Sequence, residues 1–347
     1  MEGLTSFLST IGEQVEDAEE VHDIKTCTHV NPSTLESFLL FSQSIPSSNL
    51  GFVDSKSTTI DLTIHDQEYT IHQSPTLLSS SRAGGTTGAV IWKITPLFAK
   101  WLSSLKNPLW TEGVLTPSST IVELGCGISA LTALTLAPLL NDGGHYLATD
   151  QEYVQKLFRT NLEANPPFAS RTKGRAKTSS SKGKSSKGSK TASATSSTSS
   201  GKDNLHPNIT LTSLDWETDI PDTLKSQIQS NETAADDLGD EDKGFDLLIS
   251  CDCIYNDALI PPFVRTCAEI ARLRPSYSSF SSSSETGSST KCPTICIIAQ
   301  QQRSPEVFEA WLMETMRYFH VWRVREDILG REMGVDSGYL VHVLLVK

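Results

Sequence analysis

The sequence has no apolar run of about 18 residues, the length that a membrane-spanning helix needs. Its first residues, Met1 to Thr5, provide no basic stretch ahead of an apolar one, so we expect no signal peptide. Hydrophobic residues make up only 37% of the 347, which indicates that part of the chain never enters a core. We therefore expect a protein of the cytoplasm, with the nucleus as the alternative, and no membrane partner.

Basic charge is scarce outside one segment. The net charge is −12, yet residues 171–202 contain nine Lys and Arg and no Asp or Glu, so the rest of the chain carries −21. An acidic body of this kind argues against a broad nucleic-acid-binding face and suits a basic protein partner. We expect no direct binding of nucleic acid by the core.

Cysteine pairs with the spacing of a structural zinc site are missing. The seven cysteines are an odd number in a chain that we place inside the cell, where thiols stay reduced. Cys251-x-Cys253 and Cys292-x3-Cys296 lack the two-residue spacing of zinc loops, and both pairs border apolar segments. Because free cysteine behaves as a small apolar residue in such places, we expect no bound metal.

Three low-complexity segments interrupt the chain. Residues 169–203 are rich in Ser and Lys, residues 226–243 are acidic, and residues 276–291 include nine serines. Such segments cannot bury enough apolar area to offset the entropy of ordering them. Basic runs of the first kind can bind RNA or direct nuclear import, but we interpret all three segments as solvated insertions.

The remaining chain alternates strand and helix patterns. This alternation predicts an α/β fold with a mostly parallel sheet covered on both faces. No helix pattern separates the last two strands, so they are expected to pair antiparallel and close the sheet. The strands are predicted at 120–124, 145–149, 208–212, 245–250, 294–299, 320–325 and 339–346, and the helices at 129–140, 151–164, 258–273 and 305–318.

A less regular region precedes this core. Residues 60–64 and 69–72 alternate around a short turn, which predicts a β-hairpin, and a helix is possible at 32–43. We expect residues 1–119 to form an N-terminal extension with this hairpin as a cap, and residues 120–347 to form the core.

The segment from Ile121 to Ala130 is the most informative motif. An apolar strand ends in Glu123 and Leu124, and Gly125-Cys126-Gly127 follows at the start of a helix pattern. Glycines there let a nucleotide-like ligand approach the backbone at the helix N-terminus. The spacing also fits the G-x-G-x-x-G/A fingerprint of dinucleotides, so two cofactors compete. S-adenosylmethionine (AdoMet) is the other, and there Glu123 would help to hold the cationic methionine end.

Two further residues follow the next strands. Asp150 ends the second core strand, where a carboxylate can accept both hydroxyls of an adenosine ribose. Its alternative role is to cap the next helix, and both roles can hold together. Trp216 follows the third strand and either stacks on an adenine ring or belongs to the core.

The fourth core strand leads into Ser250-Cys-Asp-Cys-Ile-Tyr255. An acid, Asp252, and an aromatic residue, Tyr255, thus emerge at the edge where α/β sheets bind ligands, so we expect the reaction site there. Trp92, upstream of the core, either fastens the N-terminal segment or covers the cofactor.

In this order, the motifs resemble the methyltransferase-21-like branch of seven-β-strand AdoMet methyltransferases, which contains protein lysine methyltransferases. Within that branch the chain looks most like the fungal ribosomal lysine N-methyltransferase 5 family, outside the three insertions and from about residue 55 onward. The residues that carry the resemblance are Trp92-x3-Pro96, Glu123-Leu-Gly-Cys-Gly127, Asp150, Asp215-Trp216 and Asp252-Cys-Ile-Tyr255.

The resemblance implies a Rossmann-like class I methyltransferase sheet of seven strands with an antiparallel last strand. It also implies methyl transfer to a lysine of a large-subunit ribosomal protein of the L1 type, with Asp252 and Tyr255 at the mouth through which the lysine enters. Asp252 would orient the amine rather than act as an obligatory base. The AdoMet contacts that it implies are Trp92, Gly125, Cys126, Gly127, Asp150, Trp216 and Cys251.

Three rival interpretations stay open. An NAD(P)-dependent oxidoreductase would need a hydride-site Tyr-x3-Lys or a His/Asp pair, and we find none that convinces. A methyltransferase for RNA or small molecules is the second, although Asp-Cys-Ile-Tyr stands where amino-methylating nucleic-acid enzymes tend to have Asn-Pro-Pro-Tyr. The third is an AdoMet-binding scaffold that recruits partners without catalysis.

Overall fold

The computed structural model describes residues 2–15, 32–42, 50–81, 86–141, 143–167, 205–228, 242–277, 292–334 and 336–347. The predicted insertion at 169–203 lies outside the described residues. The insertions predicted at 226–243 and 276–291 also lie outside them, except for a few residues at their ends.

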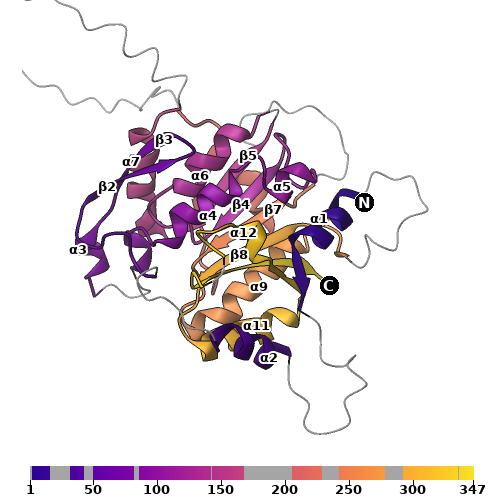
Figure 1. Ribbon diagram of the computed structural model, residues 1–347. Helices are drawn as coiled ribbons and strands as arrows, with labels where there is room; N and C mark the ends of the chain where they lie inside the picture. Colours follow the sequence, from indigo (N-terminus) through magenta and orange to yellow (C-terminus); the bar gives the residue numbers. More distant parts are fainter. Residues whose placement is uncertain are drawn as a thin grey trace, which may run out of the picture.

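The central element is an eight-stranded sheet with the order β1-β9-β10-β8-β7-β4-β5-β6 (Figure 1). The five strands from β6 to β8 in this order are mutually parallel, whereas β10 pairs antiparallel with both β8 and β9. The bounds are Gly12–Gln14 for β1, Thr120–Leu124 for β4, His145–Asp150 for β5, Ile209–Ser213 for β6, Leu247–Cys251 for β7, Ile295–Gln301 for β8, Phe319–Val324 for β9 and Tyr339–Val346 for β10.

The strand order identifies the fold. Counted from β4 in chain order, the core strands read 3-2-1-4-5-7-6, which is a Rossmann order with an antiparallel last strand placed beside the fifth. This arrangement is the class I methyltransferase fold that the resemblance implied, so the predicted fold class is confirmed. One strand was not predicted: β1 pairs antiparallel with β9 and extends the sheet at its edge.

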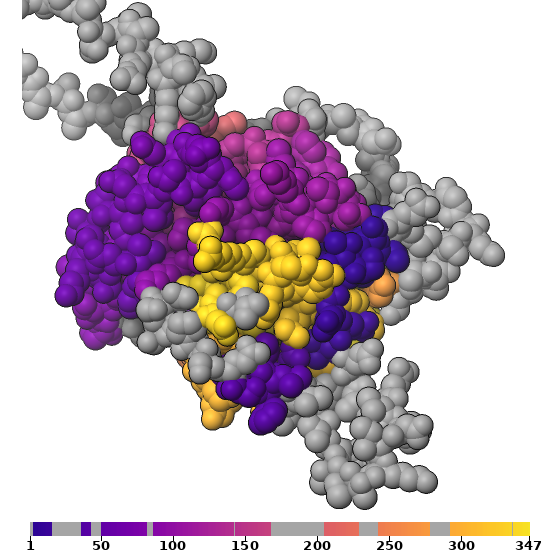
Figure 2. Space-filling model, in the orientation of Figure 1, coloured from indigo at the N-terminus to yellow at the C-terminus, as the bar shows by residue number. Residues whose placement is uncertain are grey.

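Helices cover both faces of the sheet. One face carries α1, α4, α6 and α7, and the other carries α2, α9 and α11 (Figure 1), each face with its own cluster of buried apolar side chains. The N-terminal segment and α2 lie against the C-terminal strands and α11 (Figure 2). The bounds are Glu2–Ile11 for α1, Pro32–Phe41 for α2, Ile94–Leu102 for α4, Leu131–Leu136 for α6, Gln155–Ala164 for α7, Ile260–Ala271 for α9 and Pro305–Met316 for α11.

Shorter elements connect these layers. Three are single-turn α-helices, α3 (Pro75–Leu78), α5 (Pro108–Thr111) and α12 (Glu326–Leu329). The 3-10 turns are η3 (Thr87–Ala89), η4 (Ala137–Leu139), η5 (Glu152–Val154), η6 (Pro221–Gln227) and η7 (Asp257–Leu259). None of the helices among the described residues is long and apolar enough to cross a membrane.

The predicted hairpin is present and is fastened to the core. Strands β2 (Thr59–Ile64) and β3 (Gln67–His72) pair antiparallel. Asn161 on α7 accepts a hydrogen bond from the His72 backbone N–H at 2.7 Å and donates to the carbonyl oxygens of His72 and Ile128. Ile128 follows the glycine motif, so a buried amide links the hairpin to the loop that we expect to hold the cofactor. The division into an extension at 1–119 and a core at 120–347 stays a prediction.

Candidate active site

The glycine motif forms a tight loop at the end of β4. Gly125 and Gly127 adopt left-handed φ angles of +69° and +60°, which favour glycine. The backbone N–H groups of Gly125 and Cys126 both donate to the carbonyl oxygen of Thr149 on β5. A Cβ atom on Gly125 would lie 2.3 Å from the Cys253 sulfur, so only glycine fits there without displacing its neighbours.

Asp150, at the end of β5, faces this loop. Its Oδ2 accepts a hydrogen bond from the Gly127 N–H at 2.8 Å, and its Oδ1 accepts one from the Gln151 N–H at 2.7 Å. Burial raises the pKa of Asp150 to about 6, against the lowering effect of these two bonds. Each carboxylate oxygen keeps a further lone pair. Asp150 can therefore stabilise the loop and still accept hydrogen bonds from the hydroxyl groups of a ligand.

Glu123, the predicted partner of a cationic group, lies at the floor of the site. It is buried, and its Oε2 accepts a hydrogen bond from the Tyr146 hydroxyl at 2.7 Å. Burial raises the pKa of Glu123 to about 7, with nearby Asp150 adding to the effect and hydrogen bonds from Tyr146 and Thr132 opposing it. A buried acid that ionises near neutral pH is destabilised when charged and would gain from a cationic ligand.

The raised pKa of Glu123 leads to a prediction for the ligand-free protein. Between about pH 4.5 and pH 7 the folded state binds a proton that the unfolded state has released, so the free energy of unfolding falls as the pH rises. Glu123→Gln removes this loss, and its stability relative to wild type should increase by up to about 3 kcal/mol across that window and level off above it. Urea unfolding at a series of pH values measures this difference. A pH-independent difference would show that Glu123 titrates normally.

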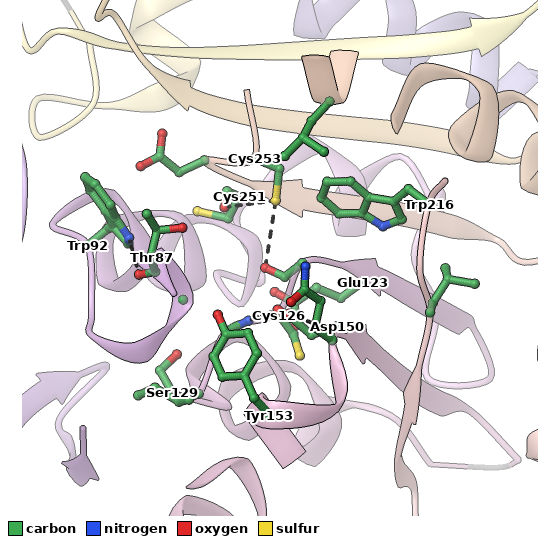
Figure 3. Close-up of a pocket in the computed structure, with 18 of the residues that line it drawn as sticks. Thr87, Trp92, Glu123, Cys126, Ser129, Asp150, Tyr153, Trp216, Cys251 and Cys253 are labelled. Carbon is green, nitrogen blue, oxygen red and sulfur yellow. Dashed lines mark hydrogen bonds between the residues drawn. The ribbon is translucent and has the colours of Figure 1, made fainter. Parts of the chain in front are cut away.

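Trp216 lies on the opposite side of the cavity from Trp92 and Thr87, with Asp150 and Cys126 between them (Figure 3). It belongs to the loop after β6, and its ring meets Phe263 of α9 edge to face, with 5.0 Å between the ring centroids. Its indole Nε1 is buried and donates to no atom of the described residues. The ring is thus fixed from behind and lines the cavity, as stacking on an adenine would require.

The wall that contains Trp92 comes from the N-terminal region. The indole Nε1 of Trp92 donates to the carbonyl oxygen of Thr87 at 3.1 Å, and the Thr87 hydroxyl donates to the Tyr255 hydroxyl oxygen at 3.3 Å. Gly88 follows, and its carbonyl oxygen accepts the N–H of Ile128. Residues far apart in sequence, 87–92 and 255, therefore form one wall of the cavity.

Asp252 follows β7 in a left-handed conformation, with φ +63°. Its carboxylate is buried and accepts hydrogen bonds from both terminal nitrogens of Arg303. It also accepts hydrogen bonds from the side-chain and backbone N–H groups of Gln301. Burial raises the pKa of Asp252, and the hydrogen bonds and charge of Arg303 oppose the rise. The acid expected to face the substrate is thus held from behind by β8 and the residue two positions after it.

All ten predicted site residues line one cavity of about 600 Å³, at the carboxyl ends of the parallel strands. This volume is within the usual range for small-molecule sites. Their roles in binding and catalysis stay predictions. Sequence reasoning missed several residues of the site, among them Thr87, Gly88 and Tyr153, which line the same cavity, and Arg303 and Gln301 behind it. Tyr153 lies three residues after Asp150, a position from which it could have been suspected.

The thiols at the site are poor nucleophiles. Burial raises the pKa values of Cys126, Cys251 and Cys253 above the usual range of a thiol, so they stay protonated at neutral pH. Across the described part of the chain, no three His, Cys, Asp or Glu residues gather in a way that could hold a metal ion.

The cavity fits AdoMet better than a phosphate-containing dinucleotide. It offers acidic groups at both ends of the glycine loop, Glu123 for an ammonium and Asp150 for ribose hydroxyls, and an aromatic face at Trp216 for a base. Among the described residues that line it there is no lysine or arginine, whereas a pyrophosphate favours basic partners.

No protein-family model matches the chain. Among curated proteins, it is 28% identical to Ribosomal lysine N-methyltransferase 5 of Zygosaccharomyces rouxii, over 70% of this chain and 69% of the relative. The protein of the same name from Candida glabrata is 26% identical, over 63% of this chain and 73% of the relative. These similarities confirm the resemblance that the motifs indicated.

A local match of 38% identity joins 34% of this chain to the Diaminohydroxyphosphoribosylamino-pyrimidine deaminase of Schizosaccharomyces pombe. The chain spans about a quarter of that relative's length, 27%. Nothing of that protein's named activity transfers from a match of this extent.

Solved structures give distant likenesses. The AdoMet-bound fibrillarin of Aeropyrum pernix matches with a TM-score of 0.37 and 13% identity, over 87% of this chain and 99% of that one. The 16S rRNA N2 G1207 methyltransferase of T. thermophilus matches with a TM-score of 0.39 and 15% identity, over 83% and 50%. Similarities with TM-scores this low support no conclusion about fold or function, so the fold assignment rests on the strand order.

Proposed function

We propose that this protein is an AdoMet-dependent protein-lysine N-methyltransferase whose substrate is a large-subunit ribosomal protein of the L1 type. The observation that carries the proposal is the single cavity lined by both predicted sets of residues. One set surrounds the glycine loop, and the other, Asp252 and Tyr255, follows the adjacent strand. The similarity to relatives named for ribosomal lysine methylation supports the choice of substrate class.

The cofactor is AdoMet, which supplies a methyl group on a sulfonium when bound. In the proposal, Asp150 accepts the ribose hydroxyls and Trp216 stacks on the adenine. Glu123 provides negative charge beneath the methionine end. Gly125 and Gly127 keep the loop free of side chains, and Cys126 and Cys251 contribute surface rather than reactive thiols.

The remaining residues handle the substrate lysine. A lysine side chain has a pKa near 10.4 in water, so it must lose its proton before it can attack a methyl group. The aromatic wall of Trp92 and Tyr255 would exclude water around the entering side chain and lower that pKa. Tyr255 is partly exposed, as a residue at a channel mouth should be, and could contact the ammonium by a cation–π interaction. Asp252 would orient the amine by hydrogen bonding.

A basic partner suits the electrostatics of the chain. Outside residues 171–202 the protein carries a net charge of −21, and exposed acids, among them Glu152, Asp215 and Glu217, lie along the cavity rim. Ribosomal proteins are rich in lysine and arginine, so long-range attraction would favour encounter. Such a substrate would place the protein in the cytoplasm, with the nucleus as the alternative.

An assay with tritium-labelled AdoMet on cell lysate tests the proposal. We expect label in the protein fraction, recovered as methyl-lysine after acid hydrolysis and unaffected by RNase. RNase-sensitive label would instead support the RNA methyltransferase, and AdoMet binding without transfer would support the scaffold. Titration calorimetry with NADH is expected to show no binding, and tight NADH binding would favour the oxidoreductase.

A further inference from the structure

The guanidinium of Arg303 contacts both Asp252 and Trp92. We propose that Arg303 is a positioning residue for the proposed methyl transfer: it holds Asp252 in place and cancels the charge of that carboxylate beside the entering amine. The inference rests on the proposed function, because it concerns how the same site prepares a lysine for attack.

The contact with Asp252 is bidentate. The Nη1 and Nη2 atoms of Arg303 donate to Oδ1 and Oδ2 of Asp252, each at 2.5 Å. The Gln301 side chain adds a bond to Oδ2 at 2.9 Å, and its backbone N–H adds a longer one to Oδ1 at 3.3 Å. Paired, nearly parallel bonds of this kind fix the carboxylate plane as well as its position. The carboxylate therefore has little freedom to move toward a substrate, and the substrate must meet it where it is held.

A second contact of Arg303 is with Trp92, in the wall that the N-terminal region forms. Its guanidinium carbon lies 4.7 Å from the centroid of the Trp92 ring. Trp92 in turn packs on Phe52, and these two residues also form an antiparallel backbone bridge. Gln301 reinforces the link, because its side-chain oxygen accepts the Gly51 N–H at 2.9 Å. Arg303 and Gln301 thus connect the N-terminal wall of the site to the acid after β7.

This arrangement solves an electrostatic problem of the reaction. A carboxylate without a counter-charge would stabilise the ammonium form of the lysine and raise its pKa, which opposes the loss of the proton. Paired with Arg303, Asp252 carries almost no net charge. Each of its oxygens already accepts two hydrogen bonds, so the amine would compete with the longest of them, that from the Gln301 N–H at 3.3 Å. In the part of the chain that the structure describes, the titratable groups that interact electrostatically with Asp252 are Arg303, Cys251, Cys253, Tyr255 and Tyr339. Arg303 is the one cation among them.

Arginine is specifically suited to both contacts. Its planar fork matches a carboxylate, and its flat face stacks on an indole, whereas a lysine ammonium can supply only the charge. Arg303→Lys should therefore keep the charge balance and lose part of the positioning. Arg303→Met should lose both.

The test is the pH dependence of turnover, measured with tritium-labelled AdoMet and the proposed L1-type ribosomal protein as the methyl acceptor. In Arg303→Met, the carboxylate of Asp252 has no counter-charge and should raise the pKa of the substrate amine. The acid limb of the kcat profile should therefore move up by at least about one pH unit. In Asp252→Asn, the positive charge of Arg303 is no longer cancelled and should lower the pKa of the amine, so the acid limb should move to lower pH. Arg303→Lys should keep the wild-type limb while kcat falls, and the double variant Asp252→Asn with Arg303→Met should return the limb near its wild-type position. AdoMet affinity should stay within about threefold in all four variants.

Arg272→Met is the matched control, because Arg272 also lies over an aromatic ring, that of Tyr318, but away from the site. It should change neither the limb nor kcat. If the limbs of Arg303→Met and Asp252→Asn coincide with that of wild type, the charge-cancelling role is wrong. If Arg303→Met fails to fold, the limbs of Asp252→Asn and Arg303→Lys decide in its place. If wild-type protein transfers no methyl group to lysine, the proposed function itself has failed.

Discussion

Gly127→Val is expected to weaken AdoMet binding by about 5- to 150-fold. Forcing extra methyl groups into a filled space costs about 1–3 kcal/mol, and each 1.4 kcal/mol is a factor of ten in affinity. The added side chain would stand on the loop that faces Asp150 and would also come within 3.4 Å of the Gly88 carbonyl oxygen. Titration calorimetry of the purified variant measures the loss.

Backbone strain needs a separate control, because Gly127 has a φ of +60° and valine there costs about 1–2 kcal/mol of stability. Gly113→Val provides it. Gly113 has a φ of +71°, but an added Cβ would meet nothing within 4 Å, and the residue lies outside the cavity. The two variants should lose similar thermal stability, and only Gly127→Val should lose AdoMet. Equal AdoMet affinity in both would remove the glycine loop from the binding site.

Asp150→Ala is expected to reduce AdoMet affinity by about 10- to 150-fold. The estimate corresponds to about 1.5–3 kcal/mol for lost hydrogen bonds to a charged group. Part of the loss comes from the loop, because Gly127 N–H would lose its acceptor. Asp61→Ala is a suitable control, since Asp61 is an exposed acid on β2 whose side chain bonds only Thr70 in the described structure. An unchanged affinity in Asp150→Ala would contradict the ribose assignment.

The same residue should give AdoMet binding a characteristic pH dependence. The pKa of Asp150 is raised to about 6, and the ionised form is the one that accepts both ribose hydroxyls. Wild-type affinity should therefore fall as the pH drops below about 6, earlier than an ordinary aspartate would allow. Asp150→Ala should lose the part of this fall that is centred near pH 6 and keep only the dependence due to Glu123, whose pKa is raised to about 7. Calorimetry at about pH 5, 6 and 7.5, on both sides of the Asp150 pKa, distinguishes the wild type from Asp150→Ala.

The core of the fold could be predicted because its signals are local. Buried strands appear as continuous apolar runs, so the parallel β4 and the antiparallel β10 begin and end at the residues predicted from the sequence. The N-terminal region had no comparable pattern. β1 has only three residues, two of them exposed, and its place beside β9 depends on a partner more than 300 residues away. A pairing of that kind leaves no periodicity in the sequence.

The site likewise contains residues that could be predicted from the sequence and residues that could not. Asp150 and Asp252 could be predicted because Asp150 is the last residue of one parallel strand and Asp252 directly follows another, and the carboxyl ends of such strands meet at one edge. Arg303 and Thr87 could not. Arg303 matters because it reaches Asp252 and Trp92 at once, and Thr87 because it bridges Trp92 and Tyr255. These contacts depend on tertiary packing between segments that are distant in sequence.

The central claim is that this cavity methylates a lysine of a large-subunit ribosomal protein. Mass spectrometry of ribosomal proteins from a strain that lacks this protein tests it most directly, with complementation by wild type and by Asp150→Ala. We predict that one lysine methylation, on the L1-type protein, is absent in the deletion strain, returns with wild type and stays absent or strongly reduced with Asp150→Ala. If every lysine methylation of the ribosomal proteins matches the parent strain, the proposed substrate is wrong.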